Sequence, residues 1–424
     1  MSPARYSRHR LANGLRLVTC TLQESRAVSI RAYLDGGSRA EPDDRAGAAH
    51  FLEHAVFKGT RRWPSARQIG LATERFGGSA DAFTDKDHSG FVIHGPAVHF
   101  ALFAEVLADL LIAPLLDPGE IERERAVIAE ELRACRDDAD DLAKTQLERL
   151  LWPRHPLGRE ILGTQATIRS LTADDLDRYR QLVFSAANTV ISVASPLPTE
   201  EIVRGIEIAF GAWSGDPIGP SRPPPAPPIG PATIVESRRG EQARFRIGFI
   251  VPSRAEPGRH TLDVLTTCLA GPATSRLELK LREELGLVYD VTASLEQYVD
   301  TGLLTIVAGV HPDRLTDAVR AIVEELRAMR GSIGIEEAAS TRDYLIGRWL
   351  CAEGTDFHAS FAGRDEQVFG CPTTVDAEID ALRAVTVEEM IELAHRTMVP
   401  ANCYLSVVGP SSSVRTARRI LDDL

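Results

Sequence analysis

The 424-residue sequence lacks the features that would place it in a membrane or in an oxidising compartment. It has no run of about 18 apolar residues that could span a bilayer, and no apolar stretch follows its basic N-terminal residues as in a secretory signal. Its six cysteines include no CxxC pair, a pattern that favours reduced, mostly buried thiols. We therefore expect a soluble, cytoplasmic protein.

An excess of positive charge is also missing. The formal net charge is -12 and no cluster of lysine and arginine overrides it locally, so neither nucleic acid nor an anionic membrane is an expected partner. The apolar share of 44% and the charged share of 25% are those of an ordinary globular protein. The length exceeds what one hydrophobic core organises, which predicts at least two domains.

Two stretches of the sequence occur twice at nearly the same spacing. The pentapeptide SRAEP stands at Ser38–Pro42 and again at Ser253–Pro257, at an offset of 215. The stretch Ser170–Pro196 aligns without a gap with Ala384–Pro410, at an offset of 214. Two distant matches in one register predict a duplicated unit of about 210 residues.

The duplication predicts the domain organisation. We expect an N-terminal domain at 1–212, a proline-rich linker at 213–231 that is extended and semi-rigid, and a homologous C-terminal domain at 232–424. Each copy has strand-like alternating segments separated by helical stretches. The fold class is therefore α+β, with two homologous α/β sandwich halves, each a mixed sheet with helices on one face.

The stretch HFLEH at 50–54 is the first candidate site. On a helix, His50 and His54 lie one turn apart on the same face, so both imidazoles could bind one metal ion. Glu53 lies at the edge of that face, within reach of a water molecule beside the ion. The same residues also fit an ordinary core helix that carries two histidines.

A hydrolytic zinc ion has three protein ligands and one open position, so a third ligand is required. The helical stretch DPGEIERERAVIAEELRACRDD offers two candidates, Glu124 and Glu131. They are seven positions apart and therefore lie on one stripe of a helix.

These motifs together resemble the inverzincins, the zinc peptidase family of pitrilysin, insulin-degrading enzyme and the mitochondrial processing peptidase. The resemblance rests on HxxEH and on the last glutamate of ERAVIAEE, which follows the second histidine at a spacing of 77. The resemblance implies one Zn²⁺ per chain, bound by His50, His54 and Glu131. It also implies that Glu53 is the general base and that Glu124 supports the site, whereas Glu130 is expected to face solvent.

Further segments match the family in order along the whole chain. The stretch Asp81-Ala82-Phe83-Thr84 is similar to the family strand that binds the substrate backbone, with Asp81 in place of an asparagine. HPLGREILGT at 155–164 matches a family segment that we assign to structure.

In the second copy, LREELGLVY carries Arg282 and Tyr289, which resemble the family pair that contacts substrate near the scissile bond. At a constant offset of 215, the positions that match His50, Glu53 and His54 are Leu265, Cys268 and Leu269. The second copy is therefore expected to keep the fold without the metal site.

The resemblance implies a zinc-dependent endopeptidase that cleaves extended peptides, for oligopeptide turnover or leader-peptide processing. The short members of the family act as pairs of chains. Because this chain carries both HxxEH and the Arg/Tyr pair, a homodimer is expected, with a heterodimer with a sister chain as the alternative. The alternative function is a non-catalytic structural or partner subunit of a peptidase-like complex.

Overall fold

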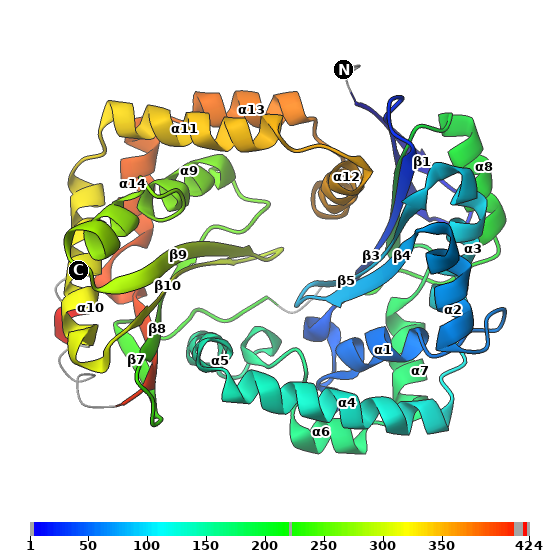
Figure 1. The fold of residues 1–424 in the computed structure, drawn as a ribbon, viewed down its shortest axis with the longest axis horizontal. Coiled ribbons are helices and arrows are strands. Elements are labelled where there is room, and N and C mark those ends of the chain that lie inside the picture. Colours follow the sequence, from blue (N-terminus) through cyan, green and yellow to red (C-terminus); the bar gives the residue numbers. More distant parts are fainter. Residues whose placement is uncertain (1–3, 220–222, 411–418, 422–424) are drawn as a thin grey trace. The chain divides into compact units, whose positions relative to one another are not determined.

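The computed structural model describes residues 4–219, 223–410 and 419–421, which form two compact units. The first unit contains the described residues of 1–132, 160–222 and 352–374, and the second contains those of 133–159, 223–351 and 375–424. Each unit is a sheet with helices, as the α+β assignment predicts (Figure 1). Between the two copies, 213–219 and 223–231 contain no helix or strand.

The sheet of the first unit has the strand order β1-β2-β6-β3-β5-β4. It is mixed, as predicted, because β2 and β6 are parallel and all other neighbours are antiparallel. The bounds are β1 (Arg5–Arg10), β2 (Arg16–Thr21), β3 (Ala27–Asp35), β4 (Ser79–Thr84), β5 (His88–Pro96) and β6 (Thr189–Ser195). β4 lies at one edge, where a further strand could pair with it.

Helices cover one face of this sheet. They are α1 (Ala48–Val56), α2 (Ala66–Thr73), α3 (Phe100–Ile112), α4 (Pro118–Asp137), α6 (Gln165–Ser170), α7 (Ala173–Val183) and α8 (Thr199–Phe210). Alternate residues of β3, among them Val28, Ile30 and Leu34, join the apolar core beneath these helices. Such alternation follows from the two-residue period of a strand.

The second unit repeats this plan with the strand order β7-β11-β8-β10-β9, in which only β7 and β11 are parallel. Its strands are β7 (Ala232–Ser237), β8 (Ala243–Val251), β9 (Val288–Gln297), β10 (Gly302–Val310) and β11 (Tyr404–Gly409). Its helices are α9 (Arg259–Leu269), α10 (Leu315–Gly331), α11 (Ile335–Leu350), α13 (Val375–Ala384) and α14 (Val387–Thr397), with a π-helix at Glu278–Glu284. The first unit has short 3-10 helices at Ser38–Ala40, Asp43–Arg45, Glu74–Phe76 and Ala97–His99. Those of the second unit lie at Pro156–Gly158, Pro312–Arg314 and Pro400–Asn402.

One helix in each unit comes from the other half of the sequence. In the first unit, α12 (Thr355–Phe369) packs on the sheet face opposite the helix layer. Asp356 accepts hydrogen bonds there from Ser29 and Arg31, and Gly363 allows close approach because a Cβ would lie 2.6 Å from the ring of Tyr33.

In the second unit, α5 (Ala139–Leu151) packs in the same way on β8 and β11. Leu147 lies over Gly248, where a Cβ would meet it at 2.9 Å, and Arg246 pairs with Asp140 at 2.8 Å. The predicted boundaries of 1–212, 213–231 and 232–424 follow chain order and stay a prediction. The compact units, in contrast, exchange 133–159 and 352–374.

The predicted duplication is visible in matching contacts. The Asn188 side-chain amide donates to Asp35 O and Val183 O, and Asn402 donates equivalently to Ile250 O and Thr397 O. Each donor and each acceptor recurs at an offset of 214 or 215. The two sheets are therefore built on one repeated scaffold.

A further pair of matching contacts involves the long helix of each copy. Arg125 of α4 donates to the carbonyl of Ile168, and Arg342 of α11 donates to the carbonyl of Val385. Donor and acceptor both recur at an offset of 217. This pair shows that α11 is the counterpart of α4.

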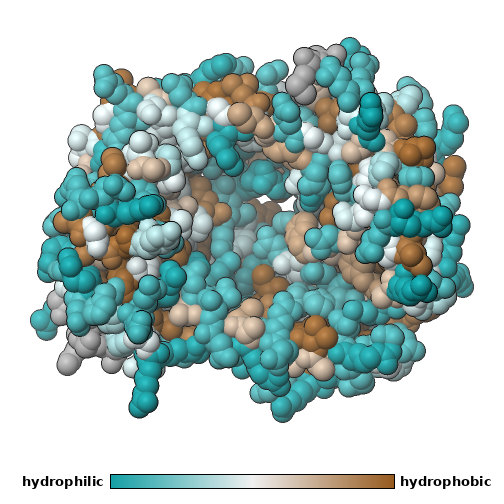
Figure 2. All heavy atoms as spheres, viewed as in Figure 1, coloured by the Kyte–Doolittle hydropathy of each residue, from teal (hydrophilic) through white to brown (hydrophobic). Residues whose placement is uncertain are grey.

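Polar side chains dominate the face shown in Figure 2, with apolar residues dispersed among them. Of the helices in the described part of the chain, none combines the length and the apolar character that a bilayer crossing requires.

Candidate metal centre

The short helix α1 carries the HFLEH stretch, as the sequence predicts. It begins after Gly47, whose φ of 95° favours glycine. His50 is 8% exposed and the ring centroids of His50 and His54 are 4.6 Å apart. The two imidazoles therefore lie side by side on one face of the helix.

Glu131 of α4 belongs to the same unit and faces both rings. Its Oε1 lies 3.6 Å from His50 Nε2 and its Oε2 lies 3.7 Å from His54 Nε2. The three potential ligand atoms all lie within 4.8 Å of one another, and no other such group of three or more occurs among the described residues. The predicted ligand set is therefore assembled.

The geometry and the protonation states of this cluster suit a zinc ion. Two ligands each about 2 Å from a tetrahedral ion lie roughly 3.4 Å apart, close to the 3.6 and 3.7 Å observed between histidine nitrogens and Glu131 oxygens. Burial, aided by the nearby His54, lowers the pKa of His50 to about 4, so the ring is neutral near pH 7. Its buried Nδ1 has no hydrogen-bond partner among the described residues.

Glu124 supports the second histidine. Its side chain is 9% exposed, two turns from Glu131 on α4, and its Oε2 lies 3.1 Å from His54 Nδ1. Its other oxygen pairs with Lys58 Nζ at 2.6 Å. This contact orients the imidazole with Nε2 toward Glu131, as a supporting carboxylate does in metal sites.

Glu53 is held by a residue of the neighbouring strand. The hydroxyl of Thr84 at the end of β4 donates to Glu53 Oε2 at 2.5 Å. Burial raises the pKa of Glu53, and the hydrogen bond from Thr84 opposes that rise. A half-buried carboxylate beside three ligand atoms is suited to general base chemistry.

The four residues of the predicted substrate strand divide between the two faces of β4. Ala82 packs on the helix-side core, and Thr84 faces Glu53 on that side. Phe83 packs with Tyr33 on the opposite face, which the two-residue period also assigns to Asp81. Asp81 is exposed, and its Oδ1 accepts from Ala82 N at 2.9 Å.

Arg282 and Tyr289 belong to the second unit. Arg282 lies on the π-helix and Tyr289 at the start of β9, and the guanidinium carbon lies 5.7 Å from the Tyr289 ring centroid. Tyr289 is 83% exposed, although tyrosine usually buries its ring. The structure brings these two residues together, while the histidine and glutamate cluster lies wholly in the first unit.

Comparison with known proteins identifies the family. Residues 16–165 match the family described as insulinase (peptidase family M16), and residues 170–342 match the peptidase M16 inactive domain. A relative from Mycobacterium leprae, named an uncharacterized zinc protease, is 32% identical over 97% of this chain and 93% of its own length. The chain belongs to the M16 peptidase family.

Other M16 relatives agree over nearly the whole length. An uncharacterized zinc protease of Bacillus subtilis is 30% identical over 96% of this chain and 99% of its own. The crystal structure of a protease from Helicobacter pylori superposes with a TM-score of 0.89 at 20% identity, covering 96% of this chain and all of that one. The latter likeness shows that the two chains share one fold.

The register in which α1 was expected to match the second copy is wrong by two positions. The buried apolar positions of α1 are all buried in α9 at an offset of 213, which also joins Val56 to Leu269 where the two helices end. In this register Asp263, Thr266 and Thr267 match His50, Glu53 and His54, instead of Leu265, Cys268 and Leu269.

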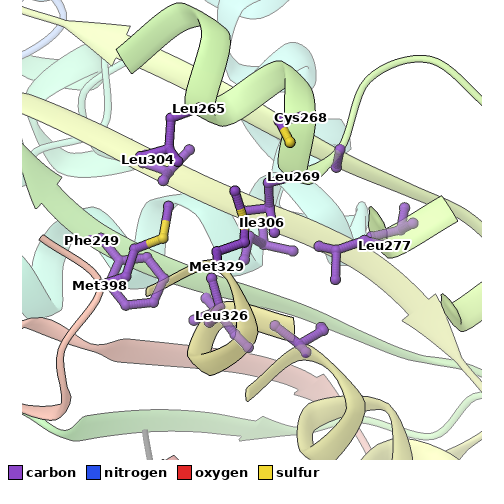
Figure 3. Close-up of a cluster of buried hydrophobic side chains, with 14 of the residues drawn as sticks. Phe249, Leu265, Cys268, Leu269, Leu277, Leu304, Ile306, Leu326, Met329 and Met398 are labelled. Atoms are coloured by element: carbon purple, nitrogen blue, oxygen red, sulfur yellow. The ribbon is translucent and has the colours of Figure 1, made fainter. Parts of the chain in front are cut away.

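Figure 3 shows that the three residues first expected belong to the apolar core of the second unit. Leu265, Cys268 and Leu269 project from α9 into a cluster that includes Leu304 and Ile306 of β10. The constant offset failed because the second copy has two residues fewer between SRAEP and the position that matches Ala48: 258–260 against 43–47. No histidine or glutamate occupies the three matched positions of the second copy.

Two supporting residues of this M16 chain were not predicted. Lys58 follows the HFLEH stretch along the chain and binds Glu124. Glu41 stands in SRAEP, which served only as evidence of duplication, yet it binds the first turn of α1. The signal for Glu41 was an acid shortly before a helix start, where carboxylates are favoured.

Proposed function

We propose that the chain is a zinc-dependent endopeptidase that cleaves extended peptides, in oligopeptide turnover or leader-peptide processing. The observation that carries the proposal is the convergence of His50, His54 and Glu131 beside Glu53 in an M16 family chain. Relatives named zinc proteases support zinc as the ion, with one ion per chain as part of the proposal.

In the proposed mechanism His50, His54 and Glu131 hold the ion. Zinc, when bound, supplies a Lewis acid that polarises a peptide carbonyl and lowers the pKa of water. Glu53 accepts the proton of the attacking water and delivers it to the leaving amine nitrogen. The hydrogen bond from Thr84 fixes the orientation of this base.

The edge of β4 supports an extended peptide as the substrate. A peptide that adds as a strand pairs its backbone with an edge and therefore must be locally unfolded. Arg282 and Tyr289 keep the role that the resemblance implies, which is contact with the substrate carbonyl region and stabilisation of the developing negative charge. Folded proteins should resist cleavage.

Metal content and chelation test the proposal directly. The purified protein should contain zinc and cleave an unstructured peptide, lose that activity on chelation, and regain it when zinc is restored. A protein without zinc that cleaves equally well before and after chelation would overturn the proposal. The alternative of a non-catalytic partner subunit is not favoured, and it predicts no cleavage in any of these states.

The proposed partner is a second copy of the chain, with a sister chain as the alternative. Glu53→Gln and Arg282→Ala should each inactivate the protein alone. If the pair acts across a dimer, mixing the two variants should restore about a quarter of parental activity, because about half the dimers are mixed and each has one working site of two. No recovery after confirmed subunit exchange would place the pair within its own chain or with a different partner.

A further inference from the structure

Glu41 contacts the metal helix at its very start. It lies in the connection between β3 and α1 and is only 4% exposed. Its Oε2 accepts from Gly47 N at 2.9 Å and its Oε1 accepts from Ala49 N at 2.7 Å. Both carboxylate oxygens are therefore used on the turn that directly precedes His50.

These two contacts satisfy backbone donors that the helix cannot satisfy itself. The first N–H groups of a helix lack partners within the helix, and Gly47 has no side chain to cap them. A buried carboxylate requires compensation, which the two N–H groups and the positive end of the helix dipole provide. Glu41 and the first turn of α1 thus stabilise each other.

The same turn is also closely packed against a second segment. A Cβ on Gly47 would lie 2.7 Å from the carbonyl oxygen of Leu162, within the segment at 155–164 that was assigned to structure. The start of α1 is therefore packed against Leu162 and hydrogen-bonded to Glu41. A shift of the helix along its axis would break the Glu41 contacts and move His50 and His54 together.

The duplicated motif provides an internal comparison. Glu256 is the counterpart of Glu41 in the second SRAEP, but its Oε2 accepts from Ser253 N at 2.6 Å and the residue is exposed. Within the described structure it makes no hydrogen bond to the first turn of α9, whose N-cap Gly258 provides no side-chain cap. The same glutamate binds the helix start only in the copy that carries the zinc ligands.

We propose that Glu41 is a positioning residue of the metal site, which fixes α1 so that His50 and His54 meet Glu131. The inference rests on the proposed function as far as the ion is zinc. Supporting carboxylates around metal ligands typically change metal affinity by about 10- to 100-fold when they are replaced. We expect an effect of that order from Glu41, which acts through the backbone at the start of α1.

The test compares Glu41→Gln with the matched control Glu256→Gln. Zinc affinity is measured by competition with a chromophoric chelator, and Glu41→Gln should weaken binding about 10- to 100-fold while Glu256→Gln stays within about twofold of the parent. At saturating zinc the kcat of Glu41→Gln should return to within a few-fold of the parental value. Parental zinc affinity in Glu41→Gln would overturn the proposal, and so would an equal loss in Glu256→Gln.

A second readout does not depend on the metal. In zinc-free protein, amide hydrogen exchange of residues 47–56 should be faster in Glu41→Gln than in the parent, and unchanged in Glu256→Gln. Unchanged exchange in both variants would contradict the proposal. If the parent itself bound no zinc, the proposed function would fail while this readout would still test Glu41. Should Glu41→Gln not fold, Glu41→Asp, which keeps the charge but is one methylene shorter, is measured with the same expectations.

Discussion

Helices α1 and α9 occupy the same place in two copies of one fold, yet only α1 carries a candidate metal site. The buried apolar positions of α1 are buried in α9 as well, at an offset of 213. The candidate site residues have no equivalent, because Asp263, Thr266 and Thr267 of α9 replace the histidines and glutamate of α1. The fold therefore depends on the buried apolar face of the helix, and the site depends on the polar side chains beside it.

The surroundings of the two helices differ in the same way. By the register of the Arg125 and Arg342 contacts, Glu124 and Glu131 of α4 match Thr341 and Arg348 of α11. A positively charged side chain thus stands where the first copy has its proposed third ligand. The proposed ligands and the residues that contact them differ together between the copies, as expected if they function as one unit.

The helix starts are also held differently. Backbone N–H groups of α1 bind Glu41, whereas at α9 the side chains of Arg259 and His260 bind Glu378 of α13. The first arrangement fixes the backbone itself, and the second fixes long side chains. The first arrangement is the one that the proposed positioning role of Glu41 requires.

The largest expected difference between the copies concerns catalysis. Glu53→Gln should retain zinc and the fold but lose about 10² to 10⁴ in kcat, because the general base is removed. The matched change Thr266→Val should leave kcat within about twofold, since the buried Thr266 hydroxyl has no hydrogen-bond partner in the described structure. Steady-state kinetics on an unstructured peptide measure both. Parental turnover in Glu53→Gln would assign proton transfer to another residue.

The repeated scaffold should respond equally in both copies. Asn188→Ala and Asn402→Ala each leave two backbone carbonyls without the amide that binds them. Each should lower the free energy of unfolding by about 1–3 kcal/mol, measured by urea denaturation. Destabilisation by only one of the two would break the comparison, because the scaffold would then differ between the copies.

The stability that Glu378 contributes at the start of α9 should depend on pH. Burial raises the pKa of Glu378, but hydrogen bonds from His260 and Arg259 outweigh that effect and lower the pKa to about 2. A lowered folded-state pKa gives stability that is present above the unfolded value of about 4.3 and is lost as the pH falls toward 2. The melting temperature of Glu378→Gln should therefore lie below that of the parent at pH 7. The gap should narrow below about pH 5, and a gap constant down to pH 3 would contradict this.

The smallest expected effect concerns substrate preference. Asp81 lies on the face of β4 opposite Thr84, where alternate side chains of an added peptide strand would project. Opposite charges across a strand pair contribute about 0.2–1 kcal/mol, so Asp81→Asn should raise KM for peptides with lysine or arginine there by up to about fivefold. Peptides with a neutral side chain at that position are the control. An equal change in KM for both kinds of peptide would show that Asp81 does not determine specificity.

Much of the site was predictable because its core is local in sequence. The spacing of His50 and His54 fixes their common face on any helix, and it does not depend on tertiary structure. Glu131 was one of two candidates on its helix, and the family resemblance chose it over Glu124. The strand-like alternating segments that the sequence shows in each copy are confirmed by the strands of the two sheets.

What could not be predicted depends on tertiary contacts. An amphipathic pattern shows that α5 and α12 bury a face but does not name the sheet that receives it, so the exchange of helices was invisible. The hydroxyl of Thr84 reaches Glu53 only because β4 passes beside α1. The shorter connection before α9 cannot be seen in an alignment without gaps.

The central claim is that one copy of the repeated fold binds zinc and the other does not. Zinc per chain, measured by elemental analysis in the parent, His54→Ala and Thr267→Ala, tests it most directly, because the two substitutions change matched positions of α1 and α9. The account predicts about one zinc in the parent and in Thr267→Ala, and a sharp loss in His54→Ala. Full zinc in His54→Ala, or loss of zinc in Thr267→Ala, would contradict it.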